Sequence, residues 1–246
     1  MKLIKRDLQR YSRQILIDRF GEKGQLKLKS STVGILGCGG LGSAVSIYLT
    51  AAGVGKLIIA DSDVVDITNL NRQVTHYEYD VENKRNKAVS EQEKLSAFNS
   101  DIKIETYTKN VNEKNVDEVF RKTDLIVDCL DNFEDRYMLN SYCVRAGKPL
   151  IHAAVYGFYG QITTIIPKKT ACLKCIFPSP PPQIKVFPII GVTTGLFGIL
   201  EASEAIKYLT GVGNYLFNEM MLIDLSENEI NKIRTERDKN CPICSS

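Results

Sequence analysis

Short, largely apolar runs alternate with segments of helical periodicity through the first half of the chain. In the segment 86–98, for example, Ala88, Val89, Gln92 and Leu95 recur at helical spacing. We predict strands at 32–36, 56–60, 102–106 and 125–129, and helices at 41–52, 86–98, 116–120 and 133–146. Strands that alternate with helices at this spacing form a doubly wound parallel sheet. The expected fold class is therefore α/β, with a Rossmann-like, mainly parallel sheet.

Two stretches of the second half lack charged residues, at 149–167 and 186–200. The first reads as two consecutive strands joined near Gly157, so we expect antiparallel strands to extend the sheet. The second is too short to span a bilayer and contains proline and glycine, which favours a buried core segment. We expect a surface loop at the prolines of 179–183, a last helix at 191–210 and a strand at 220–225.

The composition is that of a well-packed globular domain, with 246 residues, 43% of them hydrophobic and 25% charged. A net charge of +3 is too small to indicate binding to nucleic acid or to an anionic membrane. Residues 1–10 alternate charged and apolar positions, so a secretory signal peptide is not expected. The chain has seven cysteines, and without such a signal they indicate a reducing, cytoplasmic compartment.

A glycine-rich segment separates the first predicted strand from the first predicted helix. Gly37, Gly39 and Gly42 fit the pattern G-x-G-x-x-G, and Gly40 lies within it. At such a turn, backbone N–H groups approach phosphates at the positive end of the helix. Asp61 ends the next strand, where an acid can bind ribose hydroxyls. Nucleotide binding is favoured over a purely structural turn, but these residues alone do not separate NAD from ATP.

Cationic and acidic side chains that follow the glycine loop favour a triphosphate. Asn69, Arg72 and Gln73 come about ten residues after Asp61, and Lys87 begins a helix. A triphosphate carries about four negative charges and usually needs Arg, Lys and a metal ion. Arg72 and Lys87 supply cations, and Asp131 lies at the end of the fourth strand, where it could bind Mg²⁺. Taken singly, they could also be a surface arginine, a solvated lysine and a helix cap.

Two C-x-x-C pairs, Cys172/Cys175 and Cys241/Cys244, predict a zinc site. Each pair can place two thiolates on one ion, and four thiolates leave no open coordination position. We therefore expect structural zinc that ties the C-terminal segment to the middle of the sheet domain; the alternative is reduced, unliganded cysteines. The remaining cysteines read as small buried hydrophobic residues, and the histidines as satisfied core or surface residues. These are Cys38, Cys129, Cys143, His76 and His152.

Several motifs, in order along the chain, strongly resemble the ThiF/MoeB/HesA family of bacterial adenylyltransferases, relatives of ubiquitin-activating enzymes. They are residues 10–16 (RYSRQIL), 37–42 (GCGGLG), 69–73 (NLNRQ), 128–132 (DCLDN) and the two cysteine pairs. The resemblance implies a homodimer that uses ATP and Mg²⁺ to adenylate the C-terminal Gly-Gly carboxylate of a ubiquitin-like sulfur carrier protein, with release of pyrophosphate. The acyl-adenylate would serve thiocarboxylate formation in thiamine thiazole or molybdopterin biosynthesis.

The resemblance also implies roles for individual residues. Asp61 would hold the ribose, and Asn69, Arg72 and Lys87 would contact the phosphates. Asp131 would organise Mg²⁺, and Arg13 would reach the nucleotide of the partner subunit. The motif residues Gln73 and Asn132 are assigned to the same nucleotide site. The segment 82–87 is one residue longer than the family pattern, so counting forward from Arg72 selects Arg85 as the phosphate ligand. Counting back from Leu95 selects Lys87, which we prefer because the helix fixes the register.

The resemblance gives one adenylation domain over 1–246, with a nucleotide-binding half at about 1–147 and a carrier-binding and zinc half at about 148–246. Some members carry a sulfur-transfer cysteine in the crossover loop, which here is 178–187 and contains no cysteine. We therefore expect the enzyme to stop at the acyl-adenylate, with sulfur supplied by a separate persulfide donor. Outside that loop, Cys38 is the nearest thiol, at a helix N-terminus that would lower its pKa.

Two other functions compete with adenylation. An NAD-dependent oxidoreductase would explain the glycines and Asp61 but not Arg13, Arg72, Asp131 or the paired cysteines. A non-catalytic carrier-binding scaffold is disfavoured because the nucleotide residues are intact. Carrier-dependent exchange of pyrophosphate into ATP separates adenylation from both.

Overall fold

The computed structural model describes residues 2–182 and 188–245. The strands are β1 (Thr32–Leu36), β2 (Lys56–Ala60), β3 (Lys103–Tyr107), β4 (Leu125–Asp128), β5 (Leu150–Tyr156), β6 (Tyr159–Ile165), β7 (Glu219–Asp224) and β8 (Glu229–Arg234). The helices are α1 (Lys5–Arg10), α2 (Ser12–Ile15), α3 (Gly21–Ser30), α4 (Gly40–Ala52), η1 (Ile67–Asn69), α5 (Glu78–Glu82), α6 (Lys87–Phe98), α7 (Val116–Phe120), α8 (Phe133–Ala146), α9 (Leu173–Ile176) and α10 (Gly191–Thr210).

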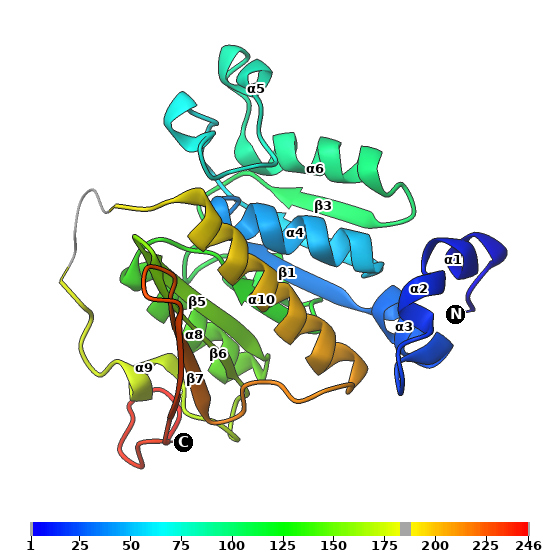
Figure 1. The fold of residues 1–246 in the computed structure, drawn as a ribbon. Coiled ribbons are helices and arrows are strands. Elements are labelled where there is room, and N and C mark those ends of the chain that lie inside the picture. Colours follow the sequence, from blue (N-terminus) through cyan, green and yellow to red (C-terminus); the bar gives the residue numbers. More distant parts are fainter. Residues whose placement is uncertain (1, 183–187, 246) are drawn as a thin grey trace.

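All eight strands belong to one sheet, in the order β3-β2-β1-β4-β5-β6-β7-β8 (Figure 1). Strands β1 to β5 pair in parallel, whereas β5 to β8 form an antiparallel meander. The expected α/β fold, mainly parallel with an antiparallel extension, is therefore confirmed. The chain leaves β1 toward β2 on one side and later returns to β4 on the other, so β1 and β4 flank the point where the strand order reverses.

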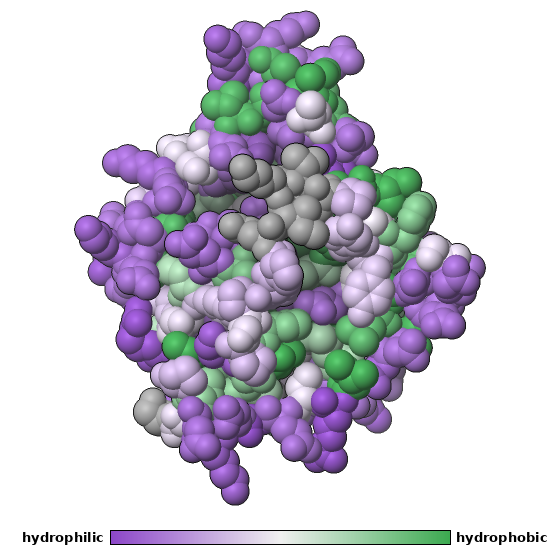
Figure 2. All heavy atoms as spheres, turned by 90° about the vertical axis from the view of Figure 1, so that its left-hand side faces the viewer, coloured by the Kyte–Doolittle hydropathy of each residue, from purple (hydrophilic) through white to green (hydrophobic). Residues whose placement is uncertain are grey.

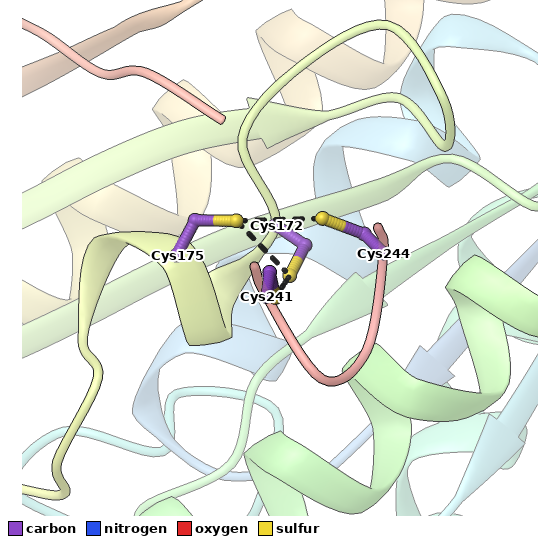
Figure 3. Close-up of side chains that lie close together, drawn as sticks. All are labelled: Cys172, Cys175, Cys241 and Cys244. Atoms are coloured by element: carbon purple, nitrogen blue, oxygen red, sulfur yellow. Dashed lines mark hydrogen bonds between the residues drawn. The ribbon is translucent and has the colours of Figure 1, made fainter. Parts of the chain in front are cut away.

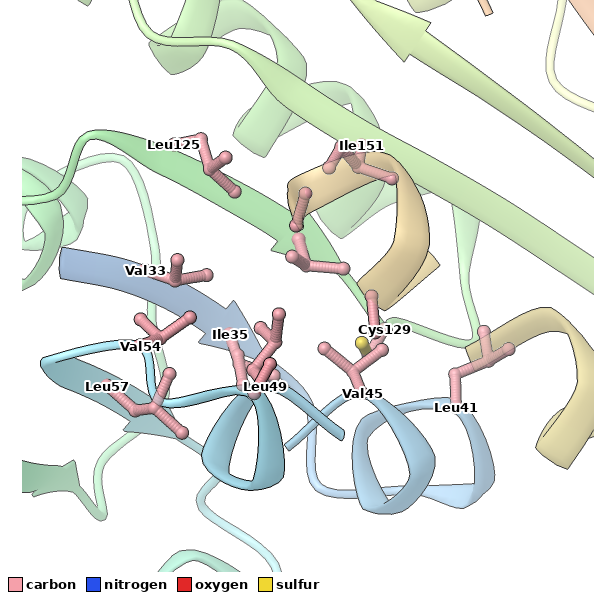
Figure 4. Close-up of a cluster of buried hydrophobic side chains, with 14 of the residues drawn as sticks. Val33, Ile35, Leu41, Val45, Leu49, Val54, Leu57, Leu125, Cys129 and Ile151 are labelled. Carbon is pink, nitrogen blue, oxygen red and sulfur yellow. The ribbon is translucent and has the colours of Figure 1, made fainter. Parts of the chain in front are cut away.

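Helices cover both faces of the sheet. On one face α4, α6 and α10 bury a core against β1, β2 and β4 (Figure 4). On the other face α7 and α8 pack against the same central strands, with Phe120 and Leu139 fully buried. Figure 4 shows Val45 and Leu49 of α4 pointing toward Val33 and Ile35 of β1. The central strands are apolar on both sides because both of their faces are covered.

Local sequence signals explain where the main helices begin and end. Helix α4 starts directly after Gly39 and ends at Gly53, whose φ of 87° is the left-handed conformation that favours glycine. The Asn132 side chain caps α8 by accepting a hydrogen bond from the backbone N–H of Asp135 at 2.9 Å. In the same way, Asn86 caps α6. The Asn132 cap fixes the backbone in the segment between β4 and α8.

The structure differs from expectation in three strand boundaries and in several short elements. Strands β3 and β7 are displaced by one residue from the predicted 102–106 and 220–225, and β4 ends one residue early. The short helices α1, α2, α3, α5 and α9 and strand β8 carry no clear periodicity and were not predicted. All six residues of β8 are exposed, which explains the missing alternation. Residues 183 and 186–187 of the predicted loop and core segment lie outside the described residues.

Helices α1 to α3 lie at the end of the sheet where β1 begins, while the loops that leave β1, β2 and β4 lie at the opposite end (Figure 1). Gln14 of α2 and Gln25 of α3 both donate to the carbonyl of Ala52, in the last turn of α4, at 2.8 and 3.0 Å. Helix α2 is thus anchored at the end of α4 that is farthest from the glycine loop. Within the described part of the chain, no helix has the length and apolar character needed to cross a bilayer.

Candidate active site

A cleft of about 1210 Å³ opens at the carboxyl ends of β1, β2 and β4. Ligands of open α/β sheets bind at this edge, at the point where the strand order reverses. Its lining includes the glycine loop after β1, Asp61 after β2 and Asp131 after β4. Ligand pockets commonly measure roughly 300–1,000 Å³, so the cleft has room for a nucleotide together with part of a second substrate.

The glycine loop is built so that its backbone faces the cleft. A Cβ atom on Gly37 would come within 2.5 Å of the carbonyl oxygen of Cys129, and one on Gly42 within 2.0 Å of the carbonyl of Gly37. These two glycines are required by packing, and Gly37 also has a φ of 102°. At Gly39 the nearest heavy atom would be 3.9 Å away. Gly39 therefore leaves open space in front of the backbone, where a phosphate group fits at the N-terminus of α4.

The Asp61 carboxylate closes the loop from the side of β2. One oxygen accepts from the backbone N–H of Cys38 at 2.7 Å, and the other accepts from that of Asp63 at 2.8 Å. Burial raises the pKa of Asp61, and these two hydrogen bonds oppose the shift. The carboxylate is thus held in a fixed orientation at the cleft wall, the position expected of an acid that binds a ribose.

The structure separates the two candidate phosphate ligands at the start of α6. Lys87 lines the cleft, and its Nζ lies 2.9 Å from an oxygen of Asp63. Arg85 instead pairs with Glu93 and with the buried Asp80, and it is absent from the described residues that line the cleft. The geometry therefore places Lys87, not Arg85, beside the glycine loop.

The other predicted residues between β2 and α6 differ in their placement. Arg72 and Gln73 line the cleft, with Arg72 donating to the carbonyl of Thr68 at 2.9 Å. Gln73 is buried, and its side-chain oxygen has no hydrogen-bond partner among the described residues. Asn69 is also buried, but its side-chain oxygen accepts from the backbone N–H of Asp66 and it does not line the cleft. In this structure Asn69 shapes the loop that presents Arg72.

Asp131 and Asn132 stand at the opposite wall, in the short loop between β4 and α8. The Asp131 side chain is exposed to the cleft, and its closest described polar contact is the Asn132 amide at 3.4 Å. Asn132 caps α8 and also donates to the carboxylate of Asp135 at 2.8 Å. An exposed carboxylate facing a phosphate loop fits Mg²⁺, which binds through one or two carboxylates together with substrate phosphates.

Behind the glycine loop lies a buried polar cluster that sequence reasoning missed. Glu91 of α6 accepts from the hydroxyl of Thr75 at 3.2 Å, and its second oxygen has no described partner. Burial raises the pKa of Glu91 to about 7. His76 contacts the carbonyl of Cys38 at 3.1 Å and the hydroxyl of Ser90 at 2.9 Å, and burial lowers its pKa to about 4. A neutral His76 therefore supports the loop from behind.

The four paired cysteines come together as expected. Sγ···Sγ distances are 3.8 Å for Cys172–Cys175, 3.6 Å for Cys172–Cys241 and 3.4 Å for Cys175–Cys244. Four thiolates at about 2.3 Å in a tetrahedron around zinc place their sulfurs about 3.8 Å apart. Figure 3 shows the side chains of Cys172 and Cys175, at the start of α9 and within it, turned toward those of Cys241 and Cys244 in the C-terminal loop. The cluster is therefore consistent with a closed, structural zinc site.

The remaining cysteines and the histidines are core residues. Cys38, Cys129 and Cys143 are buried, and burial raises the pKa of all three thiols. The expectation that the pKa of Cys38 is lowered is wrong, because burial raises it and the nearby carboxylates of Glu91 and Asp61 raise it further. His152 is fully buried and bonded to Asp128 at 2.7 Å. Neither histidine lines the cleft.

Two further cations line the cleft and were not singled out in the sequence. Lys109 follows β3 by two residues, and its position after a strand of the parallel sheet is the signal that could have identified it. Arg136 lies within α8, where the sequence pattern does not distinguish it from a surface residue. Arg13, in contrast, is exposed on α2 and lies away from its own chain's cleft.

Known proteins share both the sequence and the fold. The ThiF family model matches residues 11–243. Protein HesA (heterocyst) of Trichormus variabilis is 42% identical, covering 98% of this chain and 90% of the relative. The sulfur carrier protein adenylyltransferase of Thermus thermophilus is 37% identical, and the match covers 99% of this chain and 93% of that protein. The crystal structure of Escherichia coli MccB with ATP superimposes with a TM-score of 0.87 at 30% identity, covering 96% of this chain and 75% of that one. The protein belongs to the ThiF family.

Proposed function

We propose that the protein is an ATP-dependent adenylyltransferase that activates the C-terminal Gly-Gly carboxylate of a ubiquitin-like sulfur carrier protein. The observation that carries the proposal is the convergence of Arg72, Lys87 and Asp131 on the glycine loop, in one cleft at the strand-order reversal. An NAD site would not need these cations, since the glycines and helix dipole suffice for a pyrophosphate diester. The likeness to an adenylyltransferase of Thermus thermophilus and to ATP-bound MccB supports ATP over NAD.

In the proposed reaction, the carrier carboxylate attacks the α-phosphorus of ATP, forming the acyl-adenylate and releasing pyrophosphate. The carboxylate has a pKa of about 3.5 and needs no general base. The chemical difficulty is to bring two anions together. Arg72 and Lys87 neutralise the phosphates, Asp61 binds the ribose, and the backbone of the glycine loop receives phosphate oxygens. Mg²⁺, held by Asp131, would supply further charge neutralisation when bound.

The remaining motif residues are assigned smaller roles in the same site. Gln73 and Asn132 complete the nucleotide surface, and Asn69 holds the loop that carries Arg72. The nucleotide-binding half would cover about 1–147 and the carrier-binding half about 148–246. The antiparallel strands supply one wall of the cleft, with Tyr156 and Tyr159 lining it. That wall is where the Gly-Gly tail would enter.

We propose a homodimer because of where Arg13 lies. Helix α2 contacts the last turn of α4, and the glycine loop lies at its first turn. A helix of 13 residues is about 20 Å long, too far for an arginine side chain to reach its own nucleotide. Arg13 would instead complete the site of a second copy. Apolar side chains between β2 and α6, including Ile67 and Val74, are exposed and could be covered by a partner. Figure 2 shows apolar residues exposed near the top of the molecule.

The proposal includes structural zinc at the four cysteines, a cytoplasmic location and a separate persulfide donor for sulfur. A covalent intermediate on Cys38, Cys129 or Cys143 is disfavoured because these thiols are buried. Thiamine thiazole and molybdopterin biosynthesis are the pathways proposed for the activated carrier. Capture of the Gly-Gly protein from the source cell with the purified enzyme and ATP would separate the two.

The decisive experiment is pyrophosphate exchange. Purified protein should incorporate labelled pyrophosphate into ATP only with Mg²⁺ and a carrier ending in Gly-Gly present. A carrier lacking the two glycines is the matched control and should give no exchange. Tight NAD binding without ATP binding would support an oxidoreductase instead. ATP and carrier binding without exchange would indicate a non-catalytic scaffold.

A further inference from the structure

Arg136 occupies a buried position under the loop that carries Asp131. Its side chain is 6% exposed, and its guanidinium lies over the ring of Phe133, 5.4 Å from the centroid. One nitrogen donates to the backbone carbonyl of Leu130 and, at 3.2 Å, to that of Ala153. Nothing in the proposed chemistry above uses this side chain, although it lines the cleft.

The backbone of Leu130 is held by hydrogen bonds on both sides of its Cα atom. Its N–H donates to a carboxylate oxygen of Asp128 at 3.1 Å, and its carbonyl accepts from Arg136. A peptide unit is planar, so fixing the carbonyl of Leu130 also fixes the N and Cα atoms of the next residue, Asp131. The exposed Asp131 side chain has little support of its own. Arg136 therefore sets the position of the backbone atoms from which the Asp131 side chain extends.

The second bond of Arg136 ties this loop to the neighbouring strand. Ala153 belongs to β5, and the residues that follow it, including Tyr156, line the cleft. The guanidinium thus fixes two walls of the site relative to each other. A guanidinium presents several donors in a rigid plane, whereas a lysine ammonium is a point charge on a flexible chain.

The positive charge of Arg136 is balanced within the same cluster. Its Nε lies 3.8 Å from Asp128, which also bonds His152 at 2.7 Å. Glu201 of α10 is buried nearby, contacting the thiol of Cys129 at 3.9 Å, and burial raises its pKa. The carboxylate of Asp128, which is not among the described residues that line the cleft, therefore balances the charge of the guanidinium.

From these contacts we infer that Arg136 is a positioning residue that orients Asp131 for the adenylation step. The inference rests on the proposed function, because it assumes that Asp131 acts in turnover. In this inference Arg136 does not contact the substrate but acts by orienting Asp131. Loss of Arg136 should therefore reduce the rate of the chemical step and leave ATP binding nearly intact.

The test compares Arg136→Lys with Arg145→Lys, an exposed arginine on the same helix. In pyrophosphate exchange, Arg136→Lys should lower kcat by at least about tenfold and change the KM for ATP by less than about threefold, whereas Arg145→Lys should change neither. Adding Arg136→Lys to Asp131→Ala should cause no further loss beyond about twofold, because both act on one element. The inference would be overturned if the rate losses of the two single variants multiply in the double variant. It would also be overturned if Arg136→Lys raises the KM for ATP and leaves kcat normal.

A readout independent of activity separates this inference from the proposed function. Amide hydrogen exchange of the segment 129–133 should speed up in Arg136→Lys and not in Arg145→Lys. If wild-type protein gives no pyrophosphate exchange, the proposed function fails, and the amide exchange still decides whether Arg136 orders the loop. If amide exchange of the segment 129–133 is unchanged in Arg136→Lys, the inference that Arg136 orders this loop is refuted. If Arg136→Lys does not fold, Asp128→Asn replaces it, because it weakens the contacts that hold Arg136 with little change of side-chain shape. It should also lower kcat at nearly constant KM and speed up amide exchange at 129–133. The absence of both effects would refute the inference.

Discussion

The phenol of Tyr137 donates a hydrogen bond to the backbone carbonyl of Phe177, with 2.7 Å between the two oxygens. Tyr137 lies one turn into α8, and Phe177 directly follows α9, which carries Cys175. The ring of Phe133 packs edge-on against both residues, with centroids 5.7 and 5.5 Å apart. Phe133, Tyr137 and Phe177 line the cleft. The cysteine cluster is therefore connected to the active-site wall by direct contacts.

The first prediction concerns metal content. Purified, reduced protein should contain one zinc per chain, and Cys175→Ser should lose it. The Tm should fall by roughly 5–10 °C, because part of the zinc-binding energy stabilises the fold and each kcal/mol is worth about 2–4 °C in chains of this size. Metal analysis and calorimetry measure both effects. Cys143→Ala, which changes a thiol outside the cluster, should keep its zinc; zinc-free wild-type protein would refute the site.

The second prediction separates Lys87 from Arg85. Lys87→Ala should weaken ATP binding by about 10- to 100-fold, the range of one charge-assisted hydrogen bond to a phosphate. Arg85→Ala should leave ATP binding within about twofold, because Arg85 is paired with Asp80 and Glu93 away from the cleft. Calorimetric titration with ATP and Mg²⁺ measures both. A larger loss in Arg85→Ala than in Lys87→Ala would reverse the assignment.

The third prediction concerns Asp131 itself. Asp131→Ala should lower the rate of pyrophosphate exchange by a factor on the order of 10² or more, as expected for losing one electrostatic element of the transition state. Glu118→Ala removes an exposed carboxylate of α7 that does not line the cleft and should leave the rate unchanged. Steady-state exchange rates provide the measurement. Equal rates for Asp131→Ala and wild type would remove Asp131 from the mechanism.

The fourth prediction tests whether Arg13 acts across a dimer. Arg13→Ala and Asp131→Ala chains should each be nearly inactive alone. In a mixed dimer, one site has Asp131 from its own chain and Arg13 from the partner, so about half of wild-type activity should return if arginine is supplied in trans. Differently tagged chains allow the mixed dimer to be purified and assayed. Inactive mixed dimers would show that Arg13 acts within its own chain or not at all.

The fifth prediction concerns the pH dependence of stability. The pKa of Glu91 is raised from 4.5 to about 7, so the folded state holds its proton more tightly than the unfolded state does. Its contribution to the free energy of unfolding is complete below about pH 4.5 and decreases as pH rises to about 7. The total decrease is at most about 3 kcal/mol. The difference in free energy of unfolding, Glu91→Gln minus wild type, should therefore be more positive at pH 8 than at pH 5.

Urea unfolding of both proteins at the two pH values measures this difference. His76 acts with the opposite sign: burial lowers its pKa to about 4, so its contribution is lost as pH falls below about 6.5. Because both proteins retain His76, its effect cancels in the comparison. A difference between Glu91→Gln and wild type that does not change with pH would show that Glu91 is ionised in the folded protein across this range.

Much of the central sheet and of the cleft was predictable because local signals coincide with strand ends. The glycine loop follows β1, Asp61 follows β2 and Asp131 follows β4, and parallel strands bring such positions to one edge. Arg136 was not predictable, since its burial depends on β5, which packs against its side chain from elsewhere in the sequence. Helices α1 to α3 depend similarly on tertiary contacts. Tyr11, for example, is buried and accepts a hydrogen bond from Asn99 at 3.0 Å.

The cysteine cluster imposes an order on how the molecule is made. Cys241 lies 69 residues after Cys172, with α10, β7 and β8 between them. At synthesis rates of about 5–20 residues per second, the first pair waits roughly 3–14 s for the second. During that interval the parallel strands can already form, but only two thiolates are available to a metal. A site with four thiolates therefore cannot form until β8 and the residues after it have been made.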